Sequence, residues 1–597
     1  MKTHNDDLNQ ELQQKSTFFE ETTFKVEEAT SEKYEAVHLG EVLRDRNYTV
    51  NGKKASKKKD SEEMQAIIEK VEDLNSFFEK GYFNKNDEEG LKEIGGELLK
   101  KMKSLAEMTD NYVSTKNPWF AEGKARLNIV KQMNLRLQRD IVGMEEKLND
   151  FKSLPEEEKA RINSWTDFLN LQRTIHLVDG QKGVKISSTG GNTSDVIVIE
   201  KNGQKFFFKE EERLKSDDFG AIMDDRREEL KKELEGKEIE EGSVEDYART
   251  FIAYFKRDFE NASPSALFDF LISGGGTNDF YTGLKQALRV AGSTSDSRTG
   301  DLIYAIDQME DLKKQKEITE KIGQIFNSIR KDYVMGDIGT NTTQIRAGEE
   351  MAKRNVATAR LAKLLGLSSV VPTSEMATIE VGGKKMYGVI MGEAQGQETQ
   401  QIIAGKNKRE NKGKKVTYTG NAIRDSLHLQ VLDILCGQTD RHEGNRMSKI
   451  EKTNNNGIRV IDKVTGIDGD LSFGERSYSS LKVEDSTGFG LPAMSEEVAE
   501  RIMQLDPAVL DYEMMGLLNK RERKALKERL LGMQAAIQKR RDYEKQHPEG
   551  GTRFLSDDKW NDFTNNMRER AKNDKKFSRS LAKTYIVPEI LVGMKMK

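Results

Sequence analysis

The hydrophobic pattern of this chain changes from a helical period to a strand period and back, which limits it to folds that mix helices and strands. Up to about residue 165 the apolar residues recur at helical spacing, as at Ile67, Val71 and Leu74. After Asp179 the sequence becomes rich in β-branched and aromatic residues, with VIVIE and then KFFFK, before charged helical patterning returns from about residue 211. We therefore expect an α+β protein.

The strand-like stretch carries a strong turn signal. Asn202-Gly203 predicts a two-residue hairpin turn, because both residues tolerate positive φ. Pairing outward from this turn sets Val196 opposite Lys209, so a lysine near the strand end shares a face with valines. A functional lysine and a merely solvated strand lysine both fit this pattern. A second hairpin is expected where ATIEV and KMYGVIM flank Gly382-Gly383.

Composition excludes several classes of function. The 597 residues exceed one hydrophobic core, and the net charge of -4 gives no overall attraction to nucleic acid or an anionic membrane. The single cysteine, Cys436, excludes a disulfide framework and a cysteine-based zinc site. No 18 consecutive apolar residues occur. We expect no nucleic acid partner, no membrane span and a cytoplasmic location, with secretion by a non-classical signal left open.

One short segment combines residue types that phosphoryl transfer requires. In QTDRHEGNRM, Asp440 and Asn445 are five residues apart, the Asp-x-x-x-x-Asn step of the protein-kinase catalytic loop. Downstream, Asp468 directly follows the apolar residue Ile467 at the end of a predicted strand, where a metal-binding carboxylate is expected. Asp470 is the alternative ligand or a cap of the local turn. His428, on the apolar helix before this loop, is expected to be a packed core histidine.

These motifs resemble a known family. DRHEGN followed by GIDGDLSFG is similar to the catalytic and metal-binding motifs of the atypical, phosphatidylinositol-kinase-like and HipA-like branch of the kinase superfamily, and NVATARLAKLLG resembles a helix of large uncharacterised bacterial proteins of that kind. The resemblance implies Asp440 as the catalytic base or hydroxyl-orienting group and Asn445 and Asp468 as magnesium ligands. It implies His442 as a support near the transferred phosphate.

The resemblance also implies a nucleotide site. GVIMGEAQG resembles the strand-to-hinge passage whose backbone meets adenine, near Met391 and Glu393. Lys209 would be the lysine on the phosphates of ATP, with Gly190-Gly191 in the loop above it.

Two positions depart from the family pattern. Phe207 stands two residues before Lys209, where kinases carry a small residue against adenine. No acidic residue matches the helix glutamate that pairs with this lysine: Glu349 and Glu350 lie early in the helix, and Asn355 stands near the expected place.

Taken with the resemblance, the sequence predicts a two-lobed, kinase-like core that uses ATP and magnesium. The predicted parts are a helical N-terminal region (1–165), a β-rich small lobe (166–395) with a helical insertion (about 211–340), a helical large lobe (396–540) and a charged tail (541–597). The predicted activity is a protein Ser/Thr kinase, with a lipid or small-molecule acceptor left open. The alternatives are AMP transfer or glutamylation on the same core, a pseudokinase scaffold whose helical regions bind partner proteins, and a purely structural helical protein.

Overall fold

The computed structural model describes most of the chain, and the fold is a mixture of helices and strands that agrees with the α+β prediction. The described residues are 49–50, 53–54, 59–180, 184–188, 196–214, 218–236, 238–273, 279–290, 297–404, 415–453, 458–476, 491–548, 551–581 and 584–592. The chain divides into two units, residues 1–66 and 67–597. In the first, β1 (Thr49–Val50) pairs with β2 (Lys53–Lys54), and helix α3 (Lys59–Lys80) begins. Everything that follows concerns the second unit.

A curled sheet of six strands carries Lys209. The strand order is β3-β7-β8-β6-β5-β4, and all neighbours are antiparallel except β3 and β7. The strands are β3 (Ile175–Val178), β4 (Val184–Ser188), β5 (Val196–Lys201), β6 (Gln204–Glu210), β7 (Ser374–Val381) and β8 (Lys384–Gly392). Apolar residues on one side, among them Ile199, Phe208 and Ile379, form a core enclosed by the curl.

Both predicted hairpins are confirmed. At the β5–β6 turn, Asn202 has φ 52° and Gly203 has φ 79°, and Val196 pairs with Lys209 as expected. The β7–β8 hairpin turns at Gly382-Gly383. The register of each hairpin follows from its turn. A two-residue turn at residues with positive φ fixes which residues of the two strands lie opposite one another.

Helix α14 (Ala352–Leu365) covers the face of the sheet that carries Lys209. Lys209 pairs with Val389, which in turn pairs with Met376, so the three side chains share one face. Val389 and Met376 are buried, and α14 packs on β7 and β8. The helix ends at Gly366 in the left-handed conformation (φ 75°), the C-cap that the sequence predicts.

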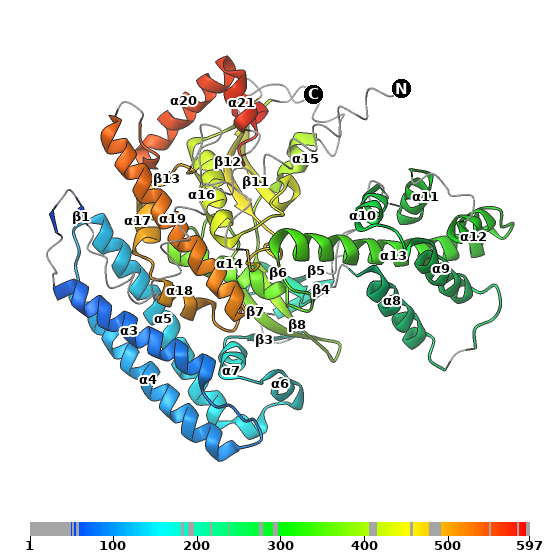
Figure 1. Ribbon diagram of the computed structural model, residues 1–597, viewed down its shortest axis with the longest axis horizontal. Coiled ribbons are helices and arrows are strands. Elements are labelled where there is room, and N and C mark those ends of the chain that lie inside the picture. Colours follow the sequence, from blue (N-terminus) through cyan, green and yellow to red (C-terminus); the bar gives the residue numbers. More distant parts are fainter. Residues whose placement is uncertain are drawn as a thin grey trace. The chain divides into compact units, whose positions relative to one another are not determined.

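A group of helices with its own core lies between β6 and α14 in the sequence and occupies the stretch where a helical insertion is predicted (Figure 1). Its helices are α8 (Phe219–Glu233), α9 (Val244–Phe259), α10 (Pro264–Ser273), α11 (Phe280–Val290), α12 (Arg298–Asp307) and α13 (Leu312–Asp337). The two ends of the stretch are held together, because Leu214 N donates to Glu349 O (2.8 Å) and Gly348 N donates to Leu214 O (2.7 Å). The end of β6 and the start of α14 therefore lie close together, although more than 100 residues separate them in the sequence.

A second sheet, in the order β10-β12-β11-β9, positions the remaining candidate residues. Its strands are β9 (Gln397–Glu398), β10 (Lys415–Tyr418), β11 (Arg446–Thr453) and β12 (Ile458–Gly466). Helix α16 (Gly420–Cys436) packs on β12 and ends at Gly437 with φ 65°. The helix predicted before the QTDRHEGN segment is thus confirmed, and that segment begins directly after the cap of the helix.

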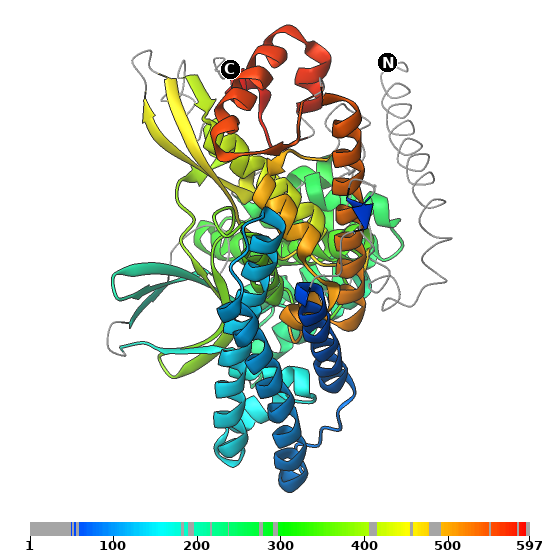
Figure 2. The same ribbon diagram turned by 90° about the vertical axis from the view of Figure 1, so that its left-hand side faces the viewer.

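Further helices lie around the two sheets (Figure 2). They are α4 (Glu88–Thr115), α5 (Ala121–Asn149), α6 (Glu156–Arg161), α7 (Trp165–Gln172), α15 (Thr399–Ala404), α17 (Glu496–Gln504), α18 (Pro507–Met514), α19 (Lys520–Gln546), α20 (Trp560–Asn573), α21 (Lys575–Leu581) and α22 (Pro588–Val592). The N-terminal helix α5 packs on α14 and on α17.

The prediction of a charged tail for 541–597 needs correction. Trp560, Leu581 and Ile590 are buried and belong to one core together with residues of α16 and β12. Charged residues outnumber apolar ones around Trp560, but the stretch YIVPEILVGM is apolar-rich and was a sign of burial that the prediction overlooked.

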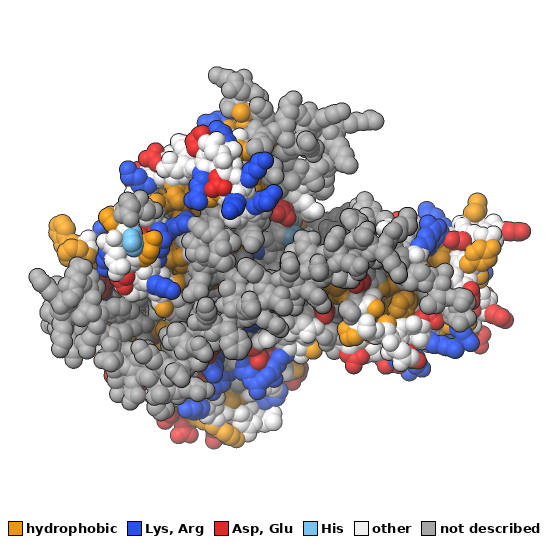
Figure 3. Space-filling view, turned by 45° about the horizontal axis from the view of Figure 1, so that its top comes forward, with side chains coloured by type: hydrophobic (Ala, Val, Ile, Leu, Met, Phe, Trp, Pro, Cys, Tyr) orange, Lys and Arg blue, Asp and Glu red, His pale blue; other side chains and the backbone are white. Residues whose placement is uncertain are grey.

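Basic and acidic side chains are interspersed on the face seen in Figure 3, in line with the small net charge of -4. Among the described residues, no helix combines the length and apolar character needed to cross a membrane.

The boundaries predicted for the small and large lobes, at residues 166–395 and 396–540, remain predictions.

The packed core histidine predicted in α16 is confirmed, and it provides a test by pH. His428 is buried, its Nε2 accepts a hydrogen bond from Ser495 N (3.0 Å), and burial lowers its pKa to about 3. Since the unfolded state then binds more protons than the folded state below about pH 6.5, the free energy of unfolding falls as the pH is lowered. We expect His428 to account for a loss of about 2 kcal/mol between pH 7 and pH 5 in urea unfolding.

The control is His428→Gln, which keeps a hydrogen-bond acceptor but does not titrate. This variant should lose less stability than the wild type between the two pH values. An identical loss in both proteins would contradict the buried, neutral imidazole.

Candidate functional site

Lys209, near the end of β6, is held by two carboxylates from the segment that follows β12. Its Nζ lies 3.2 Å from Oδ1 of Asp468 and also donates to Oδ2 of Asp470. The side chain of Asp470 is buried, whereas that of Asp468 is 44% exposed. Lys209 is therefore not a merely solvated strand lysine, whereas Lys205 on the same strand is exposed.

Asn355 of α14 holds the turn between these two aspartates. Its Oδ1 accepts a hydrogen bond from Gly469 N (2.7 Å), and its Nδ2 donates to Oδ1 of Asp470. Asp468 itself adopts a left-handed conformation (φ 59°), which turns the chain sharply at this point. A methyl group added at Gly469 would lie 3.1 Å from both Asn355 Oδ1 and Thr358 Oγ1, so the close approach favours glycine.

Neither of the two glutamates considered as partners of Lys209 contacts it. Glu349 accepts a hydrogen bond from Asn519 (3.0 Å) and Glu350 pairs with Lys353, so both are engaged elsewhere. Both carboxylates on Lys209 come from the segment after β12, and α14 contributes Asn355, which contacts Asp470 and not the lysine. The alternative role weighed for Asp470, a metal ligand, is less compatible with this burial and pairing than the same role for Asp468.

The loop after α16 brings Asp440 and Asn445 into contact. Asn445 Nδ2 donates to the backbone oxygen of Asp440 (2.8 Å) and to its Oδ2 (3.2 Å). The Gln438 side chain supports the loop from within, since its Oε1 accepts from Asp440 N (3.0 Å) while its Nε2 donates to Asp468 O (3.0 Å). One glutamine thus connects the two segments that carry the predicted catalytic and metal-binding residues.

A buried arginine makes a second connection between these segments. Arg441 donates to both carboxylate oxygens of Asp433 (2.9 and 3.1 Å), to Asn445 O (3.1 Å) and to Ile467 O. Sequence reasoning missed Gln438, Arg441 and Asp433. A signal did exist, because Asp433 interrupts the apolar run VLDILC at the end of α16, and a buried carboxylate requires a cationic or hydrogen-bonding partner.

His442 lies at the solvent edge of the loop. Its Nδ1 accepts a hydrogen bond from Gly444 N (3.0 Å), and its Nε2 is 3.9 Å from Oδ1 of Asp440. The side chain is 55% exposed. The residue is thus beside the predicted catalytic carboxylate without being locked against it.

The carboxylates of the site differ in their electrostatics. Burial raises the pKa of Asp440, and the neighbouring Asp468 carboxylate raises it further. Burial also raises the pKa of Asp470, to about 6, against the opposing effect of the Lys209 ammonium. At Asp468, by contrast, burial is opposed by Lys209 together with Asp470 and Arg441, and the pKa lies below its usual value. Asp468 is therefore the carboxylate that is both ionised and exposed.

The predicted adenine region lies on the same sheet face as Lys209. Phe207 pairs with Val198 on one side and with Met391 on the other, and all three side chains are half-buried. Glu393 is exposed beyond the end of β8. The chain then reaches the second sheet, where β9 pairs with β11 and a methyl group at Gly396 would clash with the backbone oxygen of Ser448.

The predicted phosphate loop cannot be placed in the same way. Gly190 and Gly191 lie outside the described residues, between β4 and β5.

The described residues contain no group of three or more His, Cys, Asp and Glu side chains gathered as a metal site. Asp468 and Asn445 nevertheless fit magnesium, which in ATP-dependent enzymes is held by one or two protein oxygens together with phosphate and water. The Asp468 carboxylate is exposed, and Asn445 uses its amide nitrogen on Asp440, which leaves its oxygen for a cation.

Comparison with known proteins adds no assignment: no protein-family model matches the chain, and neither does any curated protein.

Proposed function

We propose that this chain is an ATP- and magnesium-dependent phosphotransferase with a kinase-like two-lobed core, acting as a protein Ser/Thr kinase. The observation that carries the proposal is that strand β6, the loop after α16 and the segment after β12 meet. Lys209 contacts Asp468, and Asn445 donates a hydrogen bond to Asp440. Gln438 connects the loop to the segment that carries Asp468. Phosphoryl transfer from ATP requires these residue types: a lysine for the phosphates, oxygen ligands for magnesium and a carboxylate for the attacking hydroxyl.

The roles follow from the differences between the side chains. Asp468, ionised and exposed, and the Asn445 oxygen would hold magnesium, which when bound neutralises charge on the phosphates. Asp440 would orient the acceptor hydroxyl and accept its proton, for which a raised pKa is favourable. Lys209 would contact the α- and β-phosphates, while Asp470 and Asn355 hold Lys209 and the turn in place.

Nucleotide binding is supported by the strip formed by Val198, Phe207 and Met391. Its half-buried apolar side chains lie on the same face as Lys209, which suits a flat base stacked against the sheet. Phe207 makes this wall bulkier than the small residue of the familiar kinase pattern. We therefore expect an adenine pocket that is narrowed rather than absent.

Radiolabelled ATP tests the reaction directly. With a bacterial lysate as acceptor, γ-labelled ATP and magnesium should label protein, and α-labelled ATP should not. Label from the α-position would instead indicate AMP transfer. A protein that binds ATP in a thermal-shift assay but labels nothing from either position, in the lysate or on itself, would contradict the kinase and favour a pseudokinase scaffold.

A further inference from the structure

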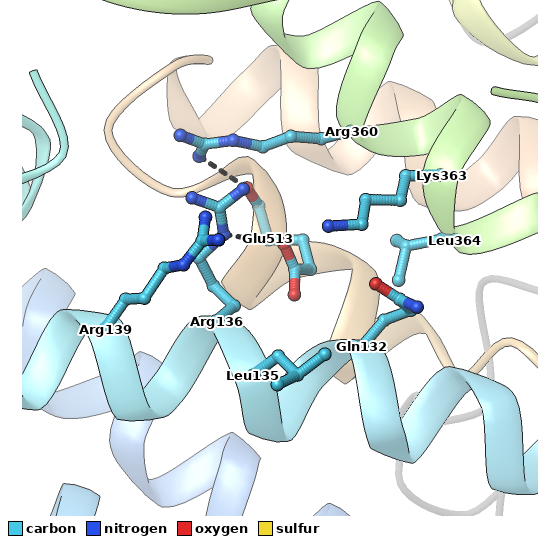
Figure 4. A pocket seen from close by; sticks show the side chains of 8 residues that line it. All are labelled: Gln132, Leu135, Arg136, Arg139, Arg360, Lys363, Leu364 and Glu513. Atoms are coloured by element: carbon cyan, nitrogen blue, oxygen red, sulfur yellow. Dashed lines mark hydrogen bonds and ion pairs between the residues drawn. The ribbon is translucent and has the colours of Figure 1, made fainter. Parts of the chain in front are cut away.

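A small hollow lies between helices α5, α14 and α18, apart from the residues that contact Lys209 (Figure 4). Four cationic side chains and one carboxylate line it, together with a glutamine and two leucines. The lining residues are Arg136, Arg139, Arg360, Lys363, Glu513, Gln132, Leu135 and Leu364. Figure 4 shows the four cationic side chains around Glu513.

Arg360 is the deepest of these cations and has unsatisfied donors. It is only 4% exposed, and its Nη1 donates to the backbone oxygen of Glu513 (3.2 Å). Its Nε and Nη2 have no hydrogen-bond partner in the described structure, and Glu375 reaches Nη2 only at 3.7 Å. Buried guanidinium donors without partners are costly, so they mark a place where an acceptor is missing.

Charge in the hollow is not balanced by its carboxylates. Arg136 lies 3.7 Å from Glu513 and 3.8 Å from Glu375, and among the described residues Arg139 and Lys363 have no ion-pair partner. The lining carboxylate Glu513 and the neighbouring Glu375 together therefore face four cations, and the adjacent Arg173 is already paired with Asp140.

The crowding affects Arg360 itself. Burial, followed by the nearby Arg136 and Arg173, lowers its pKa to about 9. An anion in the hollow would reduce the repulsion between Arg360 and the neighbouring arginines. It would also accept hydrogen bonds from Nε and Nη2 of Arg360.

We propose that this hollow binds a phosphate group. Its volume of about 60 Å³ gives room for roughly five waters, which is enough for one phosphate group. The excess of about two positive charges matches a phosphate dianion, and arginine forks suit its tetrahedral oxygens. The site is independent of the proposed kinase activity. Because its cations come from α5 and α14, a bound phosphate would strengthen the packing of the N-terminal helices on the helix that carries Asn355.

Thermal denaturation of the full chain tests the proposal, with inorganic phosphate as the probe and chloride at equal ionic strength as the reference. We expect phosphate to raise Tm by about 2 °C or more in a saturable way. A parallel titration with glycerol 3-phosphate distinguishes the sources: a shift with this ester as well as with inorganic phosphate assigns the site to phosphate esters, and a shift with phosphate alone assigns it to the free ion.

The exposed cations allow variants that leave the fold intact. Arg139→Gln combined with Lys363→Gln should abolish the phosphate-dependent shift and leave Tm in chloride unchanged. The matched control is Lys100→Gln combined with Lys124→Gln, which removes two exposed charges outside the hollow and should keep the full shift. The absence of a phosphate-specific shift in the wild type, or its persistence in the Arg139 and Lys363 variant, would overturn the proposal.

Discussion

Replacing Lys209 by methionine is expected to abolish phosphoryl transfer and to lower the free energy of unfolding by about 2 to 3 kcal/mol. The substitution leaves Asp468 and the buried Asp470 facing each other without the ammonium that both contact. Asp470 is the more costly of the two, because its pKa is already raised to about 6 with the lysine present. Urea unfolding at pH 7.5 measures the loss, and γ-labelled ATP measures transfer.

Two further variants show whether the loss of stability in Lys209→Met comes from the broken ion pair with Asp470 or from replacing any lysine of β6. Adding Asp470→Asn to Lys209→Met removes the unpaired buried charge, so the double variant should be more stable than Lys209→Met alone, while transfer remains absent. Lys205→Met makes the same change at an exposed position of β6 and should alter stability by less than about 0.5 kcal/mol. If the double variant were the less stable one, the pairing of Lys209 with Asp470 would be wrong.

Replacing Asp440 by asparagine is expected to reduce transfer about 10³-fold while Mg-ATP binding is retained. The amide keeps an oxygen for Asn445 but cannot accept a proton from the acceptor hydroxyl. The loop should keep its shape, because Gln438 and Arg441 hold it through backbone atoms and Asp433. Initial rates with γ-labelled ATP give the loss, and a thermal shift with Mg-ATP shows that the nucleotide still binds.

Glu451→Gln provides the matched control for this loss. It also neutralises one carboxylate, on the exposed part of β11 away from the loop, and should leave the rate unchanged. Transfer at the wild-type rate in Asp440→Asn would remove the assignment of Asp440.

Local signals in the sequence predicted the elements that carry the site. The turn at Asn202-Gly203, the C-cap at Gly366 and the helix before Gly437 are all confirmed. Each depends on residues within a few positions of one another, where φ preference and hydrophobic period act directly. The burial of the segment beyond 541 was missed because charged residues dominate most of it, and its core partners, among them residues of α16 and β12, lie far away in the sequence.

In the candidate site, too, features within one short segment followed from the sequence, whereas contacts between distant segments did not. The sequence predicted that Asp440 and Asn445, five positions apart, lie in one short loop, and the structure adds the hydrogen bond between their side chains. The role of Asn355 was not predictable, because it depends on how α14 meets the turn after β12, more than 100 residues later in the chain. Neither was Arg441, whose buried partners come from a helix, a loop and a strand end.

By itself, then, the sequence determined the hairpins, the helix ends and the spacing within the loop, since these depend on backbone preferences of neighbouring residues. Only the tertiary structure decided which carboxylates hold Lys209, which residue of α14 holds the turn between them, and where Arg360 keeps unsatisfied donors. Those outcomes depend on packing between elements far apart in the chain, where a charged group removed from water takes whichever partner the fold brings to it.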